Sequence, residues 1–106
     1  MTIDDDVIAE AVRMLHNAAP DASIILFGSH ARGDYNGESD LDFLVIEPTL
    51  RSRHEEMVRL RDALRPLRLP VDIIVASQDT FAEWAETPGT IFYEAREEGK
   101  VLHVAE

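Results

Sequence analysis

The chain has 106 residues, 45% of them hydrophobic, which is enough for one compact domain with a sizeable core. It contains no cysteine, and this excludes disulfides, cysteine-based zinc sites and thiol nucleophiles. Its net charge of −11, from 10 basic and 21 acidic residues, argues against direct nucleic-acid binding through phosphates. An acidic N-terminus and only short apolar runs predict a cytoplasmic protein without a secretory signal or a membrane span.

The first half of the chain alternates between predicted helices and strands. Apolar residues at helical spacing predict a helix over about residues 4–18, which ends before Pro20. The short apolar run Ser23–Phe27 predicts a buried strand, followed by a helical turn over 29–33. Residues 40–47 alternate between two faces and predict a second strand.

The second half continues the same alternation. The spacing of apolar residues predicts a long helix over 51–68, and the β-branched run 71–75 predicts a third strand. Two short helices are expected over 80–84 and 89–98, followed by a last strand over 100–104 that suits a sheet edge. This order predicts an α/β or α+β fold, a single domain of residues 1–106 in which helices cover a small sheet.

Two acidic residues in the second predicted strand are the first candidates for chemistry. Asp40 and Asp42 are two residues apart, so in a strand their carboxylates point to the same side. Their mutual repulsion would be relieved by a divalent cation such as Mg²⁺, which binds one or two carboxylates together with substrate phosphates. An isolated Asp-x-Asp is more often an exposed strand edge with both acids in water.

A third acidic residue supports the metal interpretation. Asp72 interrupts the apolar run 71–75, although aspartate is depleted in strands. If this strand lies beside the second one, three carboxylates converge and can hold metal ions for a phosphoryl-type transfer, and Asp72 can receive a proton from an attacking hydroxyl. The alternative is an exposed aspartate near the start of an edge strand.

Gly28 and Ser29 follow a buried strand and open a helical turn. Glycine permits close approach to a phosphate, and the start of a helix offers free N–H groups to an anion. Arg32, one turn further, can also meet a phosphate, but it can equally pair with Asp34 on the surface. Ser39 either contacts the metal site or, more simply, caps the entry to the acidic strand.

Together these residues resemble a known family signature. Phe27-Gly28-Ser29, ten residues, and then Asp40-Leu41-Asp42-Phe43 resemble the DNA polymerase beta-like nucleotidyltransferase superfamily. The string from Gly28 to Gly33 with Ser39 to Asp42 looks like its minimal nucleotidyltransferase (MNT) branch, and the resemblance runs from Phe27 to about Val75. It implies a mixed sheet backed by helices.

The resemblance also implies an activity, in which a hydroxyl attacks the α-phosphate of a nucleoside triphosphate and pyrophosphate leaves. Asp40, Asp42 and Asp72 would be the catalytic and metal-binding residues, with Mg²⁺ as cofactor and ATP as substrate. Nucleotide-binding roles would fall to Gly28, Ser29, Arg32 and Ser39.

Stand-alone MNT proteins resemble the antitoxins of HEPN–MNT toxin–antitoxin pairs. This likeness implies a HEPN ribonuclease toxin as partner, one tyrosine of which receives AMP and is thereby inactivated. We expect the rest of the acceptor site to come from this second chain, whose basic surface would suit the acidic one of this chain. Two alternatives stay open: an antitoxin that acts by binding alone, and a nucleotidyltransferase for small molecules of the aminoglycoside type.

Overall fold

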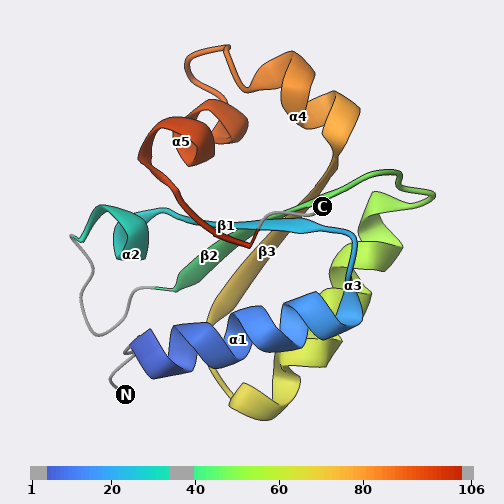
Figure 1. The fold of residues 1–106 in the computed structure, drawn as a ribbon, viewed down its shortest axis with the longest axis vertical. Helices are drawn as coiled ribbons and strands as arrows, with labels where there is room; N and C mark the ends of the chain where they lie inside the picture. Colours follow the sequence, from blue (N-terminus) through green and yellow to red (C-terminus); the bar gives the residue numbers. More distant parts are fainter. Residues whose placement is uncertain (1–4, 34–39, 104–106) are drawn as a thin grey trace.

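The computed structural model describes residues 5–33 and 40–103, which form a small sheet with helices on both faces (Figure 1). The strands are β1 (Ser23–Phe27), β2 (Leu41–Glu47), β3 (Val71–Ser77) and β4 (Lys100–His103). The helices are α1 (Asp5–Ala18), α2 (Ser29–Arg32), α3 (Arg53–Leu64), the 3₁₀ helix η1 (Arg65–Leu67), α4 (Gln78–Trp84) and α5 (Ile91–Glu98). The predicted α/β class is confirmed.

The sheet is mixed, with the strand order β3-β2-β1-β4. Strand β1 pairs antiparallel with both β2 and β4, whereas β2 and β3 run parallel. The predicted last strand therefore lies at an edge of the sheet, as expected, and β3 forms the opposite edge within the described residues. Because the central strands β1 and β2 are buried on both faces, their sequences are almost continuously apolar.

Two hydrophobic cores lie on the two faces of the sheet. On one face, α1 and α3 pack against every second residue of β2, represented by Leu41, Phe43 and Val45. On the other face, α4 and α5 cover Leu44 and Ile46. The alternation predicted for β2 is therefore present, and Asp42 shares the face that α4 and α5 cover.

The ends of several elements differ from the prediction for local reasons. The helix predicted over 51–68 begins after the cap Ser52, whose Oγ accepts a hydrogen bond from the backbone N of Glu55 at 3.2 Å. It gives way to η1 after Leu64 because Pro66 has no N–H with which to continue the α-helix. Among the described residues, no helix has both the length and the apolar character needed to cross a bilayer.

Candidate active site

The pairing of β2 with β3 brings two of the predicted carboxylates side by side. Their parallel register places Asp42 directly opposite Asp72. Residues that lie opposite each other on adjacent strands point to the same face of a sheet, so the side chains of Asp42 and Asp72 both lie on the α5 side. Asp72 is nevertheless exposed because β3 is an edge strand, so both interpretations of this residue apply. Asp40 was predicted inside the second strand, but it precedes the first paired residue, Leu41, and is exposed.

Asp42 is the most strongly perturbed of these acids. It is partly buried, and this burial is the main cause that raises the pKa of its carboxyl above the ordinary value. The negative charges of Asp72, Asp40 and Glu94, in that order, raise the pKa of Asp42 further, while His30 lowers it. Three further acids thus act on Asp42, which is a charge arrangement that a bound cation would stabilise.

Gly28 is required for this arrangement on two counts. Its φ of 77° lies in the left-handed region that favours glycine. A Cβ at this position would lie 2.2 Å from Oδ2 of Asp42, far inside van der Waals contact. The missing side chain of Gly28 therefore leaves the space in which the carboxylate of Asp42 sits.

Helix α2 follows directly and presents its first residues to the same region. Ser29 opens the helix and is partly exposed, whereas His30 is buried, with 7% of its surface accessible. Gly33 ends the helix with a φ of 88°, and its backbone N donates to the carbonyl of Ser29 at 2.9 Å. This short turn keeps Ser29 beside the carboxylates.

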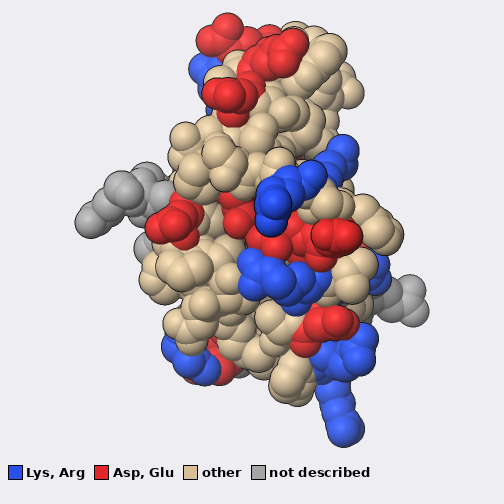
Figure 2. All heavy atoms as spheres, turned by 90° about the vertical axis from the view of Figure 1, so that its right-hand side faces the viewer, with Lys and Arg blue, Asp and Glu red and all other residues tan. Residues whose placement is uncertain are grey.

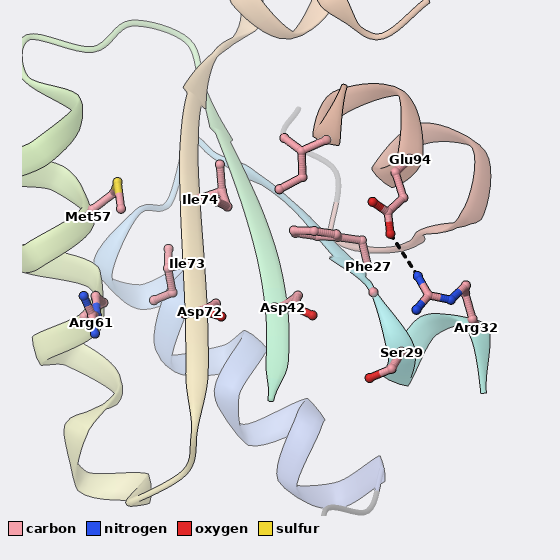
Figure 3. A pocket seen from close by; sticks show the side chains of 12 residues that line it. Phe27, Ser29, Arg32, Asp42, Met57, Arg61, Asp72, Ile73, Ile74 and Glu94 are labelled. Carbon is pink, nitrogen blue, oxygen red and sulfur yellow. Dashed lines mark hydrogen bonds and ion pairs between the residues drawn. The ribbon is translucent and has the colours of Figure 1, made fainter. Parts of the chain in front are cut away.

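A pocket of about 570 Å³ lies over these residues (Figure 3). Asp42 and Asp72 lie in its middle, with Ser29 on one side and Arg61 of α3 on the other. The pocket wraps around the edge strand β3. Its lining consists of Phe27, Gly28, Ser29, Arg32, Asp42, Met57, Arg61, Asp72, Ile73, Ile74, Ile91 and Glu94, so five of the seven predicted residues line it.

Arg32 lines the pocket and is held by acids of α5. Its Nη1 donates to Oε1 of Glu94 at 2.9 Å and lies 3.6 Å from Oε2 of Glu98. Asp34, the alternative partner expected from the sequence, lies outside the described residues. Since Arg32 is partly exposed, it stays available to an anion that competes with these carboxylates.

The carboxylates fit a hard divalent cation, although they do not form a complete cage by themselves. Within residues 5–33 and 40–103, no three acidic or histidine side chains already converge as metal ligands. Three carboxylates without a cation repel one another, which opposes a closed cluster. The negative charges that raise the pKa of Asp42, and the carboxylate oxygens of Asp42 and Asp72, suit an oxygen-ligated ion that also takes oxygens from phosphates.

Three contributors to this site were not predicted from the sequence. The spacing of His30 in the sequence matches no metal site, yet this residue is buried and acts on Asp42. Arg61 and Glu94 come from helices whose polar faces give no signal of their own. Among the predicted residues, Ser39 lies outside the described part of the chain.

Comparison with known proteins identifies the family. The model of the family described as "Nucleotidyltransferase domain" matches residues 6–98, which is most of the chain. The chain belongs to this family. Two proteins of Methanocaldococcus jannaschii, both named "Putative protein adenylyltransferase", resemble this nucleotidyltransferase chain. One is 40% identical over 53 residues, which cover 50% of this chain and 52% of the relative. The other is 70% identical over 23 residues, which cover 22% of this chain and 23% of the relative. The chain thus matches about half the length of the first relative.

Solved structures share the nucleotidyltransferase fold. A structure described as a putative nucleotidyltransferase from Sulfolobus solfataricus has a TM-score of 0.59 at 26% identity, over 74% of this chain and 70% of that one. A toxin–antitoxin structure with AMP-PNP has a TM-score of 0.67 at 19% identity, over 92% of this chain and 74% of that one. A complex of tri-AMPylated Shewanella oneidensis HEPN toxin with MNT antitoxin has a TM-score of 0.57 at 16% identity, over 91% of this chain and 68% of that one. At these identities, the last two support the fold alone.

Proposed function

We propose that residues 1–106 act as one Mg²⁺-dependent nucleotidyltransferase domain that transfers AMP from ATP to a hydroxyl of a partner protein. The observation that carries this proposal is the register of Asp42 beside Asp72 within the pocket that Gly28 and Ser29 also line. The names of the relatives from Methanocaldococcus jannaschii support a protein as the acceptor. The finer proposal is an antitoxin that modifies a tyrosine of a HEPN ribonuclease toxin.

The residues divide the reaction between them. The start of α2, with the hydroxyl of Ser29, would hold the β- and γ-phosphates where Gly28 lets backbone approach closely. Asp40 and Asp42 would hold Mg²⁺, and Asp72 would complete the site and accept the proton of the attacking hydroxyl. When bound, Mg²⁺ would neutralise charge on the triphosphate and polarise the α-phosphate. Charge neutralisation and positioning provide most of such catalysis.

The balance of the reaction is simple. The acceptor oxygen forms a bond to the α-phosphorus, and the bond from that phosphorus to the bridging oxygen of pyrophosphate breaks. The hydroxyl proton passes to Asp72, whose exposed position on an edge strand lets the acceptor reach it from solvent. Neither a nucleic acid nor a membrane is part of the proposal, in keeping with the net charge of −11.

Intact mass spectrometry of a candidate toxin partner, incubated with this protein, ATP and Mg²⁺, tests the proposal. We expect the partner to gain one or more AMP units, and Asp40→Ala or Asp42→Ala to abolish the gain. Asp21→Asn, which removes an exposed carboxylate in the turn before β1, is the matched control and should leave transfer intact. An unmodified partner that is still inhibited would instead support an antitoxin that acts by binding. Transfer to small hydroxyl compounds alone would support the small-molecule enzyme.

A further inference from the structure

A second pocket adjoins the candidate active site and is rich in arginine. It has a volume of about 510 Å³ and lies where α3 and η1 meet the start of β3. Arg61 lines both pockets, so the two are neighbours. Val58, a side chain with 44% of its surface exposed, lies at the same place. The complete lining is Val58, Arg61, Asp62, Leu64, Arg65, Arg68, Leu69 and Val71.

The charge of this pocket contrasts with that of the chain. The protein carries 21 acids against 10 basic residues, and most of its described arginines pair with a carboxylate, as Arg59 does with Glu56. In the second pocket, three arginines face one carboxylate, Asp62, which lies 2.6 Å from Arg65. Arg61 and Arg68 form no ion pair with any described residue. Unpaired arginines that share a pocket favour an anionic ligand.

The backbone of Arg68 provides an independent observation. Its φ of 53° makes it the only residue other than glycine with a positive φ in the described part of the chain. This conformation ends η1, where the backbone N of Arg68 donates to the carbonyl of Arg65 at 3.0 Å. Glycine would adopt it without strain, whereas arginine does not. The chain thus bears backbone strain at Arg68, which lines the second pocket together with Val71 at the start of β3.

The direction of the proposed reaction indicates what meets these arginines. In phosphoryl-type transfer, the attacking and leaving oxygens lie roughly in line. If the leaving pyrophosphate lies at Ser29, the acceptor must approach from beyond Asp72, over the edge strand β3. That side of the site is formed by α3 and Arg61 (Figure 3). Figure 2 views the molecule from the side of α3, where basic and acidic side chains are mixed across the middle of the face and basic side chains protrude at its lower end.

We infer that Arg61, Arg65 and Arg68, with Val58 beside them, form the docking surface for an acidic segment of the acceptor protein that adjoins its reactive hydroxyl. This inference rests on the proposed function for the direction of approach. Among the described residues β3 pairs on one side only, so such a segment can lie extended along its other side. A protein segment is favoured over a nucleic acid because the rest of the surface is strongly acidic and would repel a long polyanion.

Binding of short peptides tests the docking surface without requiring catalysis. Three fluorescent peptides would carry one tyrosine flanked by glutamates, by glutamines or by lysines, and anisotropy would be measured with a non-hydrolysable ATP analogue and Mg²⁺ present. We expect the glutamate peptide to bind about tenfold tighter than the lysine peptide at low salt, and the difference to shrink as salt screens it. Equal binding of all three peptides, or no binding, would overturn the inference.

Variants connect the binding to these arginines. Arg65→Gln combined with Arg68→Gly should weaken the glutamate peptide about tenfold while affinity for the ATP analogue stays unchanged, because neither residue lines the first pocket. Arg68→Gly alone should lower peptide affinity and leave the melting temperature unchanged or higher, since glycine relieves the positive φ. Arg53→Gln, in the first turn of α3, is the control and should bind like the parent protein.

Two further outcomes separate this inference from its alternatives. If a single-stranded RNA binds more tightly than the glutamate peptide, and loses affinity in the double variant, the surface is a nucleic-acid site and the inference fails. Mass spectrometry of the same peptides measures AMP transfer separately. Arginine-dependent binding of the acidic peptide without any transfer supports the docking surface and counts against the proposed function.

Discussion

At the scale of single residues, Gly28 is the position where backbone conformation and site chemistry meet. We predict that Gly28→Ala abolishes binding of Mg²⁺ with ATP and destabilises the fold by about 2–3 kcal/mol, from backbone strain together with the clash against Asp42. Isothermal titration with a non-hydrolysable ATP analogue and urea unfolding measure the two effects.

Gly33 supplies the matched control for that substitution. Its φ of 88° resembles that of Gly28, but a Cβ there would meet nothing within 4 Å. Gly33→Ala should therefore lose only about 1 kcal/mol, from backbone strain alone, and should still bind nucleotide. If both variants bind nucleotide equally well, the space beside Asp42 is not the reason for Gly28.

The residues that sequence could indicate are those whose chemistry conflicts with their surroundings. Asp72 stands out because an acid interrupts an apolar strand, and the register with Asp42 confirms that the two lie together. His30, Arg61 and Glu94 gave no such conflict, since polar residues on helices are ordinary. Their contribution depends on how α2, α3 and α5 pack around the sheet, which no local pattern in the sequence encodes.

At the scale of elements, the sequence patterns predicted the described strands and α-helices in the correct order, but not the 3₁₀ helix η1. The ends of strands were predicted from turn residues; for example, β1 ends directly before Gly28. The continuous helix expected over 51–68 was wrong beyond Leu64, because Pro66 prevents its continuation. The pairing order β3-β2-β1-β4 was not predicted, since strand neighbours depend on long-range packing.

The end of β2 opposite the site contains a charged cluster that joins two helices to the sheet. Burial, together with a hydrogen bond to Glu56 and the charge of that residue, raises the pKa of Glu47 from 4.5 to about 7. A hydrogen bond from Arg59 is the main cause that lowers the pKa of Glu56 to about 2. Nη1 of Arg59 also donates to the carbonyl of Ala18 at the end of α1, at 2.7 Å. Glu47 and Glu56 therefore share a proton where α1, β2 and α3 meet.

This cluster predicts that Glu47→Gln stabilises the protein in a pH-dependent way. The folded pKa of Glu47 is raised, so its contribution to stability is fully present below pH 4.5 and is lost as pH rises through about 7. Glutamine does not ionise and can still donate to Glu56. Allowing for partial exposure, we expect a gain of about 1–2 kcal/mol at pH 8 and almost none at pH 4.5.

Urea unfolding at the two pH values measures this difference. Glu55→Gln, an exposed substitution in α3 next to Glu56, is the control and should change stability little and equally at the two pH values. A gain from Glu47→Gln of equal size at both pH values would count against the shared proton. So would a loss of stability at pH 8.

At the scale of the whole molecule, the net charge of −11 predicts that the melting temperature depends on salt in general and, separately, on bound Mg²⁺. Like charges repel across the compact state, and any salt screens that repulsion, so sodium chloride should raise the melting temperature. A cation bound at Asp42 and Asp72 stabilises the folded state beyond the effect of screening. At a free concentration of ten times its dissociation constant, this binding adds about 1.4 kcal/mol to the free energy of unfolding. For a domain of this size, that corresponds to a further rise of about 6 °C.

Thermal unfolding at matched ionic strength separates the two effects. With a non-hydrolysable ATP analogue present, magnesium chloride should raise the melting temperature above that in sodium chloride. Asp42→Asn should remove this difference and yet raise the melting temperature without metal, because burial and neighbouring charges raise the pKa of Asp42 and its ionised form is therefore unfavourable at neutral pH. Asp21→Asn lowers the net charge equally and should keep the magnesium effect. An equal response to both salts in the parent protein, or a magnesium effect that survives Asp42→Asn, would assign the stabilisation to screening and place the metal elsewhere.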